Sequence, residues 1–251
     1  MAGHSHSANI RHHKNAVDAK KGKLFSKPAK AVISAARQGG GDPDANPKLR
    51  LAIEKARAAN MTRDGIERAI RRGTGEGDDA RDFEELLYEG YGPGGVALLV
   101  TCLTDNRHRT APDVKHIFDR NHGNLGATGS VSFLFEFRSR FVSERAGRDE
   151  DSLMELALEA GASDVELEDE YVTIFAPAIE FVQVKQALEA AGLSFVSAET
   201  AYVPLNWVEV ADREDARRVL KLVDALEEND DVQSVFANYD IPEEWLAELQ
   251  G

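Results

Sequence analysis

The feature that most constrains the fold is a change in hydrophobic period near residue 75. Before it, apolar residues recur every three or four positions, as on one face of an α-helix; after it they alternate, as in half-buried β-strands. A glycine-rich segment, residues 73–79, separates the two patterns and is typical of a linker. We therefore predict a domain boundary here, with a helical domain before it and strands paired into sheets after it.

Three short helices are expected before this boundary. The first begins at Ser26 and ends at the glycines 39–41. The second begins at Asn46, a capping residue followed by Pro47 at the first helical position, and runs to about residue 60. The third runs from Thr62 to Gly73. They predict a small bundle whose exposed face carries four arginines: Arg63, Arg68, Arg71 and Arg72.

Strands dominate after the linker. Residues 84–91 and 96–104 read as two strands joined by a glycine-rich turn, and a helix opened at Thr110 and a strand at 131–137 follow. Residues 139–203 then give the order βαββαβ, which indicates a ferredoxin-like unit. A strand at 207–210, a helix from Asp212 to about residue 228 and a strand at 232–237 are too few to form a domain, so we expect them to complete the sheet begun at residue 84.

The predicted fold class is therefore α+β with three domains. Residues 1–75 form a basic arm and a three-helix bundle. Residues 80–137 and 205–241 form a discontinuous middle α/β domain, and residues 138–204 form an inserted ferredoxin-like domain.

Charge divides the chain in the same place. Residues 1–75 carry 16 Lys and Arg against 6 Asp and Glu, although the whole chain has a formal net charge of -14. The first thirty residues hold seven Lys or Arg, four His and one acid, Asp18, and show no strand or helix periodicity before about residue 25. Such an arm contributes little to a core and is suited to a polyanion, so local charge predicts nucleic-acid binding despite a pI near 5.0.

Other motifs have simpler interpretations. The string from Gly90 to Gly95 fits a dinucleotide-binding pattern, but a strand follows it where a helix N-terminus is needed. Cys102 alternates with apolar neighbours and is expected to be a buried free thiol. The acidic clusters 166–170 and 227–231 are interpreted as solvated surface. Four N-terminal histidines could suggest a metal site, and Ala2-Gly3-His4 would suit Cu²⁺ or Ni²⁺ if the initiator Met is removed. They lack Cys or carboxylate partners and lysines crowd them, so no metal or cofactor is predicted.

Residues 105–110 carry a more specific signal for an anion-binding site. They lie where a strand gives way to a helix, so Arg107 and Arg109 would stand beside backbone donors at the positive end of a helix, an arrangement suited to anions. The alternative is that Asp105 and Arg107 simply hold the loop together. Both interpretations stay open at this point.

The compartment is inferred from what the sequence lacks. One cysteine excludes an internal disulfide, and no apolar run approaches the ~18 residues that span a bilayer. We expect a cytoplasmic protein that does not bind membranes.

Several strings resemble the YebC/PmpR family over nearly the whole chain. They include the N-terminal MAGHS, residues 9–11 (NIR), 66–70 (IERAI), 88–96 (YEGYGPGGV), 102–107 (CLTDNR) and 123–126 (GNLG). The resemblance implies three domains, the third inserted in the second, and no catalytic residues. It also implies a role as a DNA-binding transcriptional regulator or as a ribosome-associated factor that assists synthesis of proline-rich stretches.

The chain departs from the family in its arm. Where the family has Lys-Trp, this chain has His6-Ser7, so an aromatic side chain that could stack on a base is absent there. The residues and the resemblance together predict phosphate contacts from these side chains: His4, Asn9, Arg11, His13, Lys14, Lys20, Lys21, Lys23, Lys27, Lys30, Arg37, Arg107 and Arg109.

The predicted function is a non-enzymatic, nucleic-acid-binding regulator of gene expression. Ribosomal RNA is favoured, because a basic arm recognises RNA backbone without a sequence code, whereas a DNA-binding regulator needs a set of base-reading side chains. Sequence-specific DNA binding is the alternative. A hydrolase built on the His cluster and a protein scaffold acting through the acidic domains are the competing classes, and the oligomeric state is left open.

Overall fold

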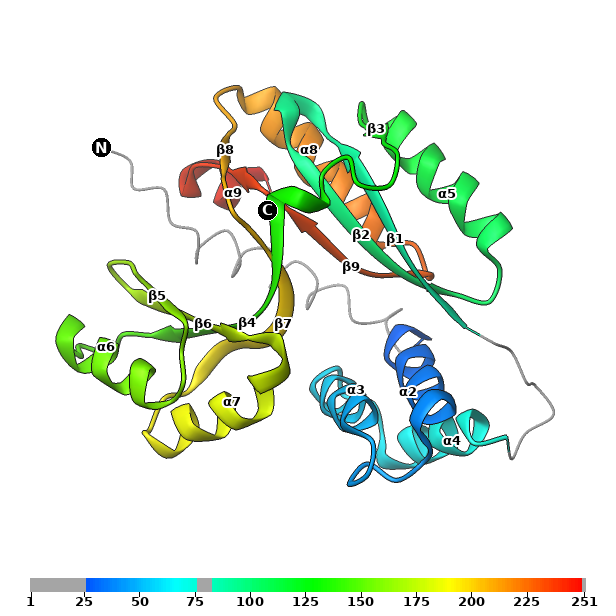
Figure 1. The fold of residues 1–251 in the computed structure, drawn as a ribbon. Coiled ribbons are helices and arrows are strands. Elements are labelled where there is room, and N and C mark those ends of the chain that lie inside the picture. The colour runs from blue at the N-terminus through cyan, green and yellow to red at the C-terminus, as the bar shows by residue number, and fades with distance from the viewer. Residues whose placement is uncertain (1–25, 76–82, 250–251) are drawn as a thin grey trace.

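The computed structural model describes residues 26–75 and 83–249 and confirms the α+β class with three parts (Figure 1). Three helices form the first part. The second is a four-stranded sheet of order β3-β1-β2-β9, and the third is a four-stranded sheet of order β5-β6-β4-β7. The predictions made for the arm before residue 26 and for the linker at 76–79 lie outside the described residues.

The helical domain contains the three predicted helices, α2 (Ser26–Gly39), α3 (Pro47–Ala58) and α4 (Arg63–Gly73). Asn46 caps α3, because its side chain accepts from the N–H of Leu49, and Thr62 caps α4 in the same way. The end of α4 packs closely on α2: a Cβ at Gly73 would lie 2.5 Å from the carbonyl oxygen of Ile33. Only glycine allows the two helix backbones to approach this closely.

The middle domain is built from two segments of the chain that are far apart in sequence. The first segment supplies β1 (Glu84–Tyr91), β2 (Ala97–Thr104), α5 (Arg107–Arg120) and β3 (Asn124–Leu125). The second supplies β8 (Val208–Glu209), α8 (Arg213–Glu227), β9 (Val232–Ala237), β10 (Tyr239–Asp240) and α9 (Glu243–Leu249). Because β9 pairs antiparallel with β2, the C-terminal elements complete the sheet begun at residue 84, as expected.

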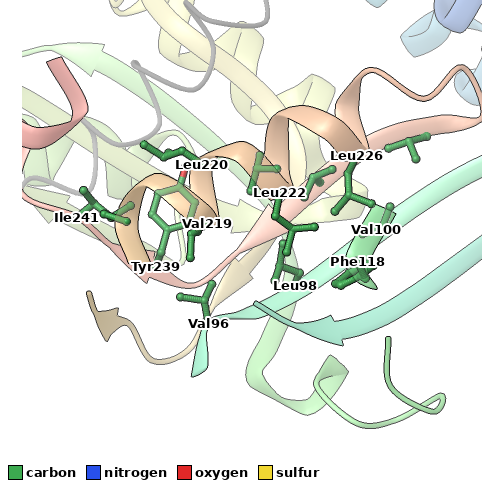
Figure 2. Close-up of a cluster of buried hydrophobic side chains, with 14 of the residues drawn as sticks. Val96, Leu98, Val100, Phe118, Val219, Leu220, Leu222, Leu226, Tyr239 and Ile241 are labelled. Carbon is green, nitrogen blue, oxygen red and sulfur yellow. The ribbon is translucent and has the colours of Figure 1, made fainter. Parts of the chain in front are cut away.

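Alternation along β2 explains where the core of this sheet lies. Leu98 and Val100 point to the face covered by α5 and α8, where they pack on Phe118, Leu222 and Leu226 (Figure 2). Cys102 belongs to the same cluster. Ala97 and Leu99 point to the other face and pack on Val131 and Phe135. The strand is buried on both faces, so it reads as a nearly continuous apolar run.

The inserted part has the predicted βαββαβ order. Its elements are β4 (Phe135–Glu144), α6 (Glu150–Glu159), β5 (Asp164–Leu167), β6 (Tyr171–Pro177), α7 (Phe181–Ala190) and β7 (Phe195–Pro204). The first strand lies between the fourth and the third, and all pairs are antiparallel, which is the ferredoxin-like arrangement. Phe141, Leu153, Ile174 and Leu188 fill its core.

Two sequence predictions of elements were wrong. The strands predicted at 131–137 and 139–144 are a 3-10 helix at Ser132–Leu134 followed by the single strand β4. The near end of β4 places Phe135 in the middle-domain cluster and the far end places Phe141 in the inserted core, so one strand shows two apolar runs. The helix predicted to open at Thr110 begins at Arg107, where Asn106 is the cap.

Short elements were not predicted at all: β3, β10 and α9. The exact domain limits 1–75, 80–137 with 205–241, and 138–204 stay a prediction, and β4 runs across the one at 137/138. Within the two described ranges, every helix is too short or too polar to cross a bilayer.

Candidate nucleic-acid interface

The first turns of α2 lie against the middle domain. Lys30 Nζ donates to Asp231 Oδ1 at 2.8 Å and to the backbone carbonyl of Asp230 at 2.9 Å. Lys27 Nζ donates to the backbone carbonyl of Glu227, the last residue of α8. That carbonyl belongs to the last turn of α8, where the helix dipole is negative, so Lys27 stabilises the end of a helix in another domain.

Asp231 is the centre of this contact, and the prediction that the cluster 227–231 is solvated surface was wrong for it. Its side chain is 7% exposed. Its Oδ2 accepts from Arg109 Nη2 at 2.8 Å and from the hydroxyls of Thr110 at 2.8 Å and Thr104 at 3.1 Å. Burial alone would raise the pKa of Asp231, but the hydrogen bonds from Lys30, Arg109 and Thr110 outweigh it and lower the pKa to about 2. The carboxylate therefore stays ionised at neutral pH.

Local sequence explains how these groups meet. Asp231 precedes β9 directly, and its backbone carbonyl accepts from the N–H of Leu103 in β2, which fixes it at the end of that strand. Helix α5 starts three residues after β2, and its cap Asn106 accepts from the N–H of Arg109. Arg109 and Thr110 are thereby turned toward Asp231. A sequence of two acids before a strand gives no signal that one of them is buried.

The two arginines of residues 105–110 have different surroundings in the structure. Asp105 pairs with Arg109 at 3.0 Å rather than with Arg107. Arg107 is 62% exposed, with Glu84 at 3.9 Å, a distance at which an ion pair contributes little. Arg109 therefore holds the loop and Asp231 together, although its side chain is 48% exposed, and Arg107 is the more exposed arginine of this turn. Whether either contacts phosphate stays a prediction.

Helix α4 carries four exposed arginines, and α3 carries three further exposed basic residues, Lys48, Lys55 and Arg57. Arg68, Arg71 and Arg72 are exposed and are separated by three and four residues, so they lie on the same side of the helix. Ile66, Ala69 and Gly73 occupy the opposite side, against α2. We call these three arginines the α4 arginine cluster. Arg63, the fourth predicted arginine, is 91% exposed and pairs with Glu67.

The remaining predicted phosphate contacts divide into two groups. Eight belong to the arm and lie outside the described residues: His4, Asn9, Arg11, His13, Lys14, Lys20, Lys21 and Lys23. Arg37 is half-buried at the end of α2. The structure thus brings Lys30 and Arg109 together at the carboxylate of Asp231, while Lys27 donates to the backbone carbonyl of Glu227.

Two further titratable groups have structural roles. Burial alone would raise the pKa of Glu89, but the backbone N–H groups of Gly129, Val131 and Ser132 donate to its carboxylate at 2.6 to 2.8 Å and lower the pKa overall. Glu89 thus holds the glycine-rich loop before β4, a role that sequence reasoning missed.

Cys102 is the buried free thiol expected, and burial raises its pKa to about 12. In the described ranges no group of three His, Cys, Asp or Glu could hold a metal, and the histidines near the N-terminus lie outside them.

The lowered pKa of Asp231 predicts how stability depends on pH. A carboxyl whose pKa falls from 3.8 to about 2 on folding adds about 2 kcal/mol at pH 7, and this contribution is lost as the pH drops through about 4 to 2. We expect Asp231→Asn to lower the free energy of unfolding at pH 7 by about that amount and to leave roughly half of the difference at pH 3. Urea unfolding of both proteins at pH 7, 5, 4 and 3 measures this; a difference that does not change with pH would contradict it.

These observations define a class: a three-domain α+β protein with a basic helical domain held against an acidic body by a buried carboxylate. Family models match nearly all of the chain. The TACO1/YebC N-terminal domain matches residues 5–76, and the TACO1/YebC second and third domain matches residues 83–239. The chain therefore belongs to the YebC/PmpR family, which confirms the resemblance drawn from its motifs.

Relatives match over their full length. The chain is 51% identical to a protein of Rubrobacter xylanophilus over 251 residues, covering 100% of both chains, and 52% identical to one of Halothermothrix orenii, covering 99% of both. Each is named a probable transcriptional regulatory protein. A crystal structure of a conserved hypothetical protein from Aquifex aeolicus is 47% identical, with a TM-score of 0.78 over 90% of this chain and 93% of that one.

Proposed function

We propose that the protein is a non-enzymatic, nucleic-acid-binding regulator of gene expression that binds ribosomal RNA and assists translation, including that of proline-rich stretches. The relatives named probable transcriptional regulatory proteins support the broader part, regulation of gene expression. The α4 arginine cluster is the observation that carries the nucleic-acid part. Three guanidinium groups on the outer side of one helix offer charge and hydrogen-bond donors to phosphate oxygens.

Charge distribution indicates which part of the protein faces the nucleic acid. Residues 1–75 have an excess of ten positive charges, whereas the rest of the chain has an excess of 24 negative charges. The acidic domains are repelled by phosphate, so the helical domain faces the nucleic acid and the other two face away from it. The acidic domains are then free to contact a protein partner in the cytoplasm.

Ribosomal RNA is favoured over duplex DNA because contacts from exposed arginines to its backbone are enough for binding. Arginines spaced along the outer side of α4 suit phosphate and backbone shape, which is how folded RNA is recognised. A sequence-specific DNA regulator also needs side chains that read base edges in the major groove. Sequence-specific DNA binding is the alternative function, and the experiment below separates the two.

The test compares binding of the purified full chain to intact ribosomes and to mixed-sequence duplex DNA across a range of salt concentrations. On duplex DNA, the logarithm of affinity falls with the logarithm of salt by about 0.9 per phosphate neutralised, so nonspecific attraction is recognised by its steep slope. We expect ribosome binding to persist at physiological salt, while DNA binding fades without a preferred sequence.

Two outcomes would contradict the ribosomal proposal. If one duplex sequence retains nanomolar binding at physiological salt and ribosomes do not bind, the protein is a transcription factor and the ribosomal proposal is wrong. If neither binds, the nucleic-acid function as a whole is wrong.

A further inference from the structure

The contact between α2 and the middle domain uses the basic groups that a polyanion would seek. Two lysines predicted to contact phosphate, Lys27 and Lys30, instead donate to oxygens of the segment from Glu227 to Asp231. Burial lowers the pKa of Lys27, and the Lys30 side chain is only 21% exposed. In this arrangement neither ammonium group is fully available to an outside anion.

The two oxygens of Asp231 serve different domains. Oδ2 accepts from Arg109, Thr104 and Thr110, all in the middle domain. Oδ1 accepts from Lys30 in the helical domain. The bonds to Oδ2 all come from the middle domain, so they hold the carboxylate in place independently of α2. Its Oδ1 is therefore a fixed anionic acceptor, at the position where a phosphate oxygen would bind Lys30.

Among the described residues, lysines of α2 and α3 make hydrogen bonds and ion pairs between the helical domain and the middle domain. Besides Lys27 and Lys30, Lys48 pairs with Glu85 at the surface. In the described parts of the chain, the buried apolar cluster of α2–α4 takes in one residue of the middle region, Phe83, which precedes β1. Toward the inserted domain, Leu51 packs on its core and Glu54 lies 3.7 Å from Lys185. Contacts of this kind are weakened by competing ions, whereas a large apolar interface is not.

We propose that Asp231 and the end of α8 act as an intramolecular substitute for phosphate: they mask Lys27 and Lys30, and a polyanion displaces them, releasing the helical domain from the middle domain. The inference deepens the proposed function and rests on it. The exposed α4 arginine cluster makes the first contact, and the α2 lysines join only after the domains separate. Affinity is thereby reduced in the docked form, and release couples binding to a change in domain arrangement.

The first test measures the distance between the two domains directly. Spin labels are placed at Ala58→Cys at the end of α3 and Lys221→Cys on α8, both exposed positions. The natural Cys102 is buried with a raised pKa and stays unlabelled. We expect Asp231→Asn to lengthen and broaden the distance distribution, and inorganic polyphosphate to do the same to the labelled protein with Asp231 intact.

The matched control is Asp230→Asn. It removes the same charge one residue away, but Asp230 is exposed and only its backbone carbonyl accepts from Lys30. The Asp230 carboxylate attracts Lys27 through space only, so the distance distribution of Asp230→Asn should change clearly less than that of Asp231→Asn. An unchanged distribution in Asp231→Asn, or an equal change in Asp230→Asn, would overturn the proposal. The polyphosphate arm needs no ribosome, so it tests the masking contact even if the proposed function fails.

The second test uses affinity for ribosomes and separates masking from simple loosening. Asp231→Asn should bind about three- to tenfold more tightly, because Lys27 and Lys30 are released for phosphate. Lys30→Ala should open the domains equally, yet bind no more tightly than the parent, since it also removes a phosphate contact. Lys30→Ala leaves the bonds to Asp231 Oδ2 intact, so it is the informative variant if Asp231→Asn folds poorly. Tighter binding by both variants, or by neither, contradicts masking.

Discussion

Replacing Arg68, Arg71 and Arg72 together by glutamine is expected to weaken binding to ribosomal RNA about 30- to 100-fold at 0.1 M salt. Each arginine that neutralises a phosphate releases a counterion, so the triple variant should also flatten the salt dependence by about two to three units of slope. All three side chains lie on the exposed side of α4, and the residues that hold α4 on α2 are untouched. Binding titrations at several salt concentrations give both quantities.

A matched control lies on α8. Arg213, Arg217 and Arg218 have 42 to 59% exposed side chains, at spacings of four and one, on a helix of the acidic middle domain. Changing these three to glutamine alters net charge by the same amount and should leave affinity within about twofold, because their partners are Glu214, Asp215 and Glu248 rather than phosphate. If both triple variants lose affinity equally, the effect is one of net charge and the α4 arginine cluster is not the contact surface.

Phe118→Ala is expected to lower the free energy of unfolding of the middle domain by about 3 to 5 kcal/mol. Phe118 is fully buried on α5, and its ring packs against two glycines. A Cβ would lie 2.6 Å from a ring atom at Gly90 and 2.9 Å from one at Gly123. The surrounding strand and loop are paired by backbone hydrogen bonds, so they cannot collapse into the cavity. The larger part of the loss is therefore not recovered by relaxation.

Urea unfolding followed by tryptophan fluorescence measures this change, since Trp245 packs against the same core as Phe118. Phe133→Ala is the matched control. It removes the same atoms from a side chain that is 67% exposed, so it should cost less than about 1 kcal/mol. A similar loss in the two variants would mean that Phe118 does not stabilise the middle-domain core as the structure indicates.

The two sets of cations on the helical domain have different surroundings. The α4 arginines face solvent, whereas the α2 lysines face oxygens of the middle domain. Both sets look alike in sequence, as basic residues at helical spacing near the N-terminal end of the chain. The difference determines which variants should weaken binding from the outset and which should act only after the domains separate.

The sequence by itself determined the class of fold, the order of its main elements and the family. Hydrophobic period and capping residues act over a few neighbours, so α2, α3, α4, the hairpin of β1 and β2, and the βαββαβ order could all be predicted from local patterns. The return of the C-terminal elements to the first sheet was also predictable, because a strand, a helix and a strand cannot bury their apolar faces alone. The excess of positive charge in the first 75 residues is likewise a property of the sequence alone.

Tertiary structure alone decided what those charges face. Asp231 reads as one acid in a solvated cluster, yet pairing of β9 with β2 buries it beside Arg109 and Thr110, and docking of α2 adds Lys30. Glu89 lies in a strand that the sequence predicts, yet its carboxylate holds a loop forty residues later, which no pattern in that strand indicates. Burial and ion pairing depend on groups that the chain brings together from 40 to 201 positions away, and no local pattern encodes such a distance. The interactions that form a helix reach only about four residues along the chain, so local sequence predicts them. The partner of a charged side chain is set by the complete fold.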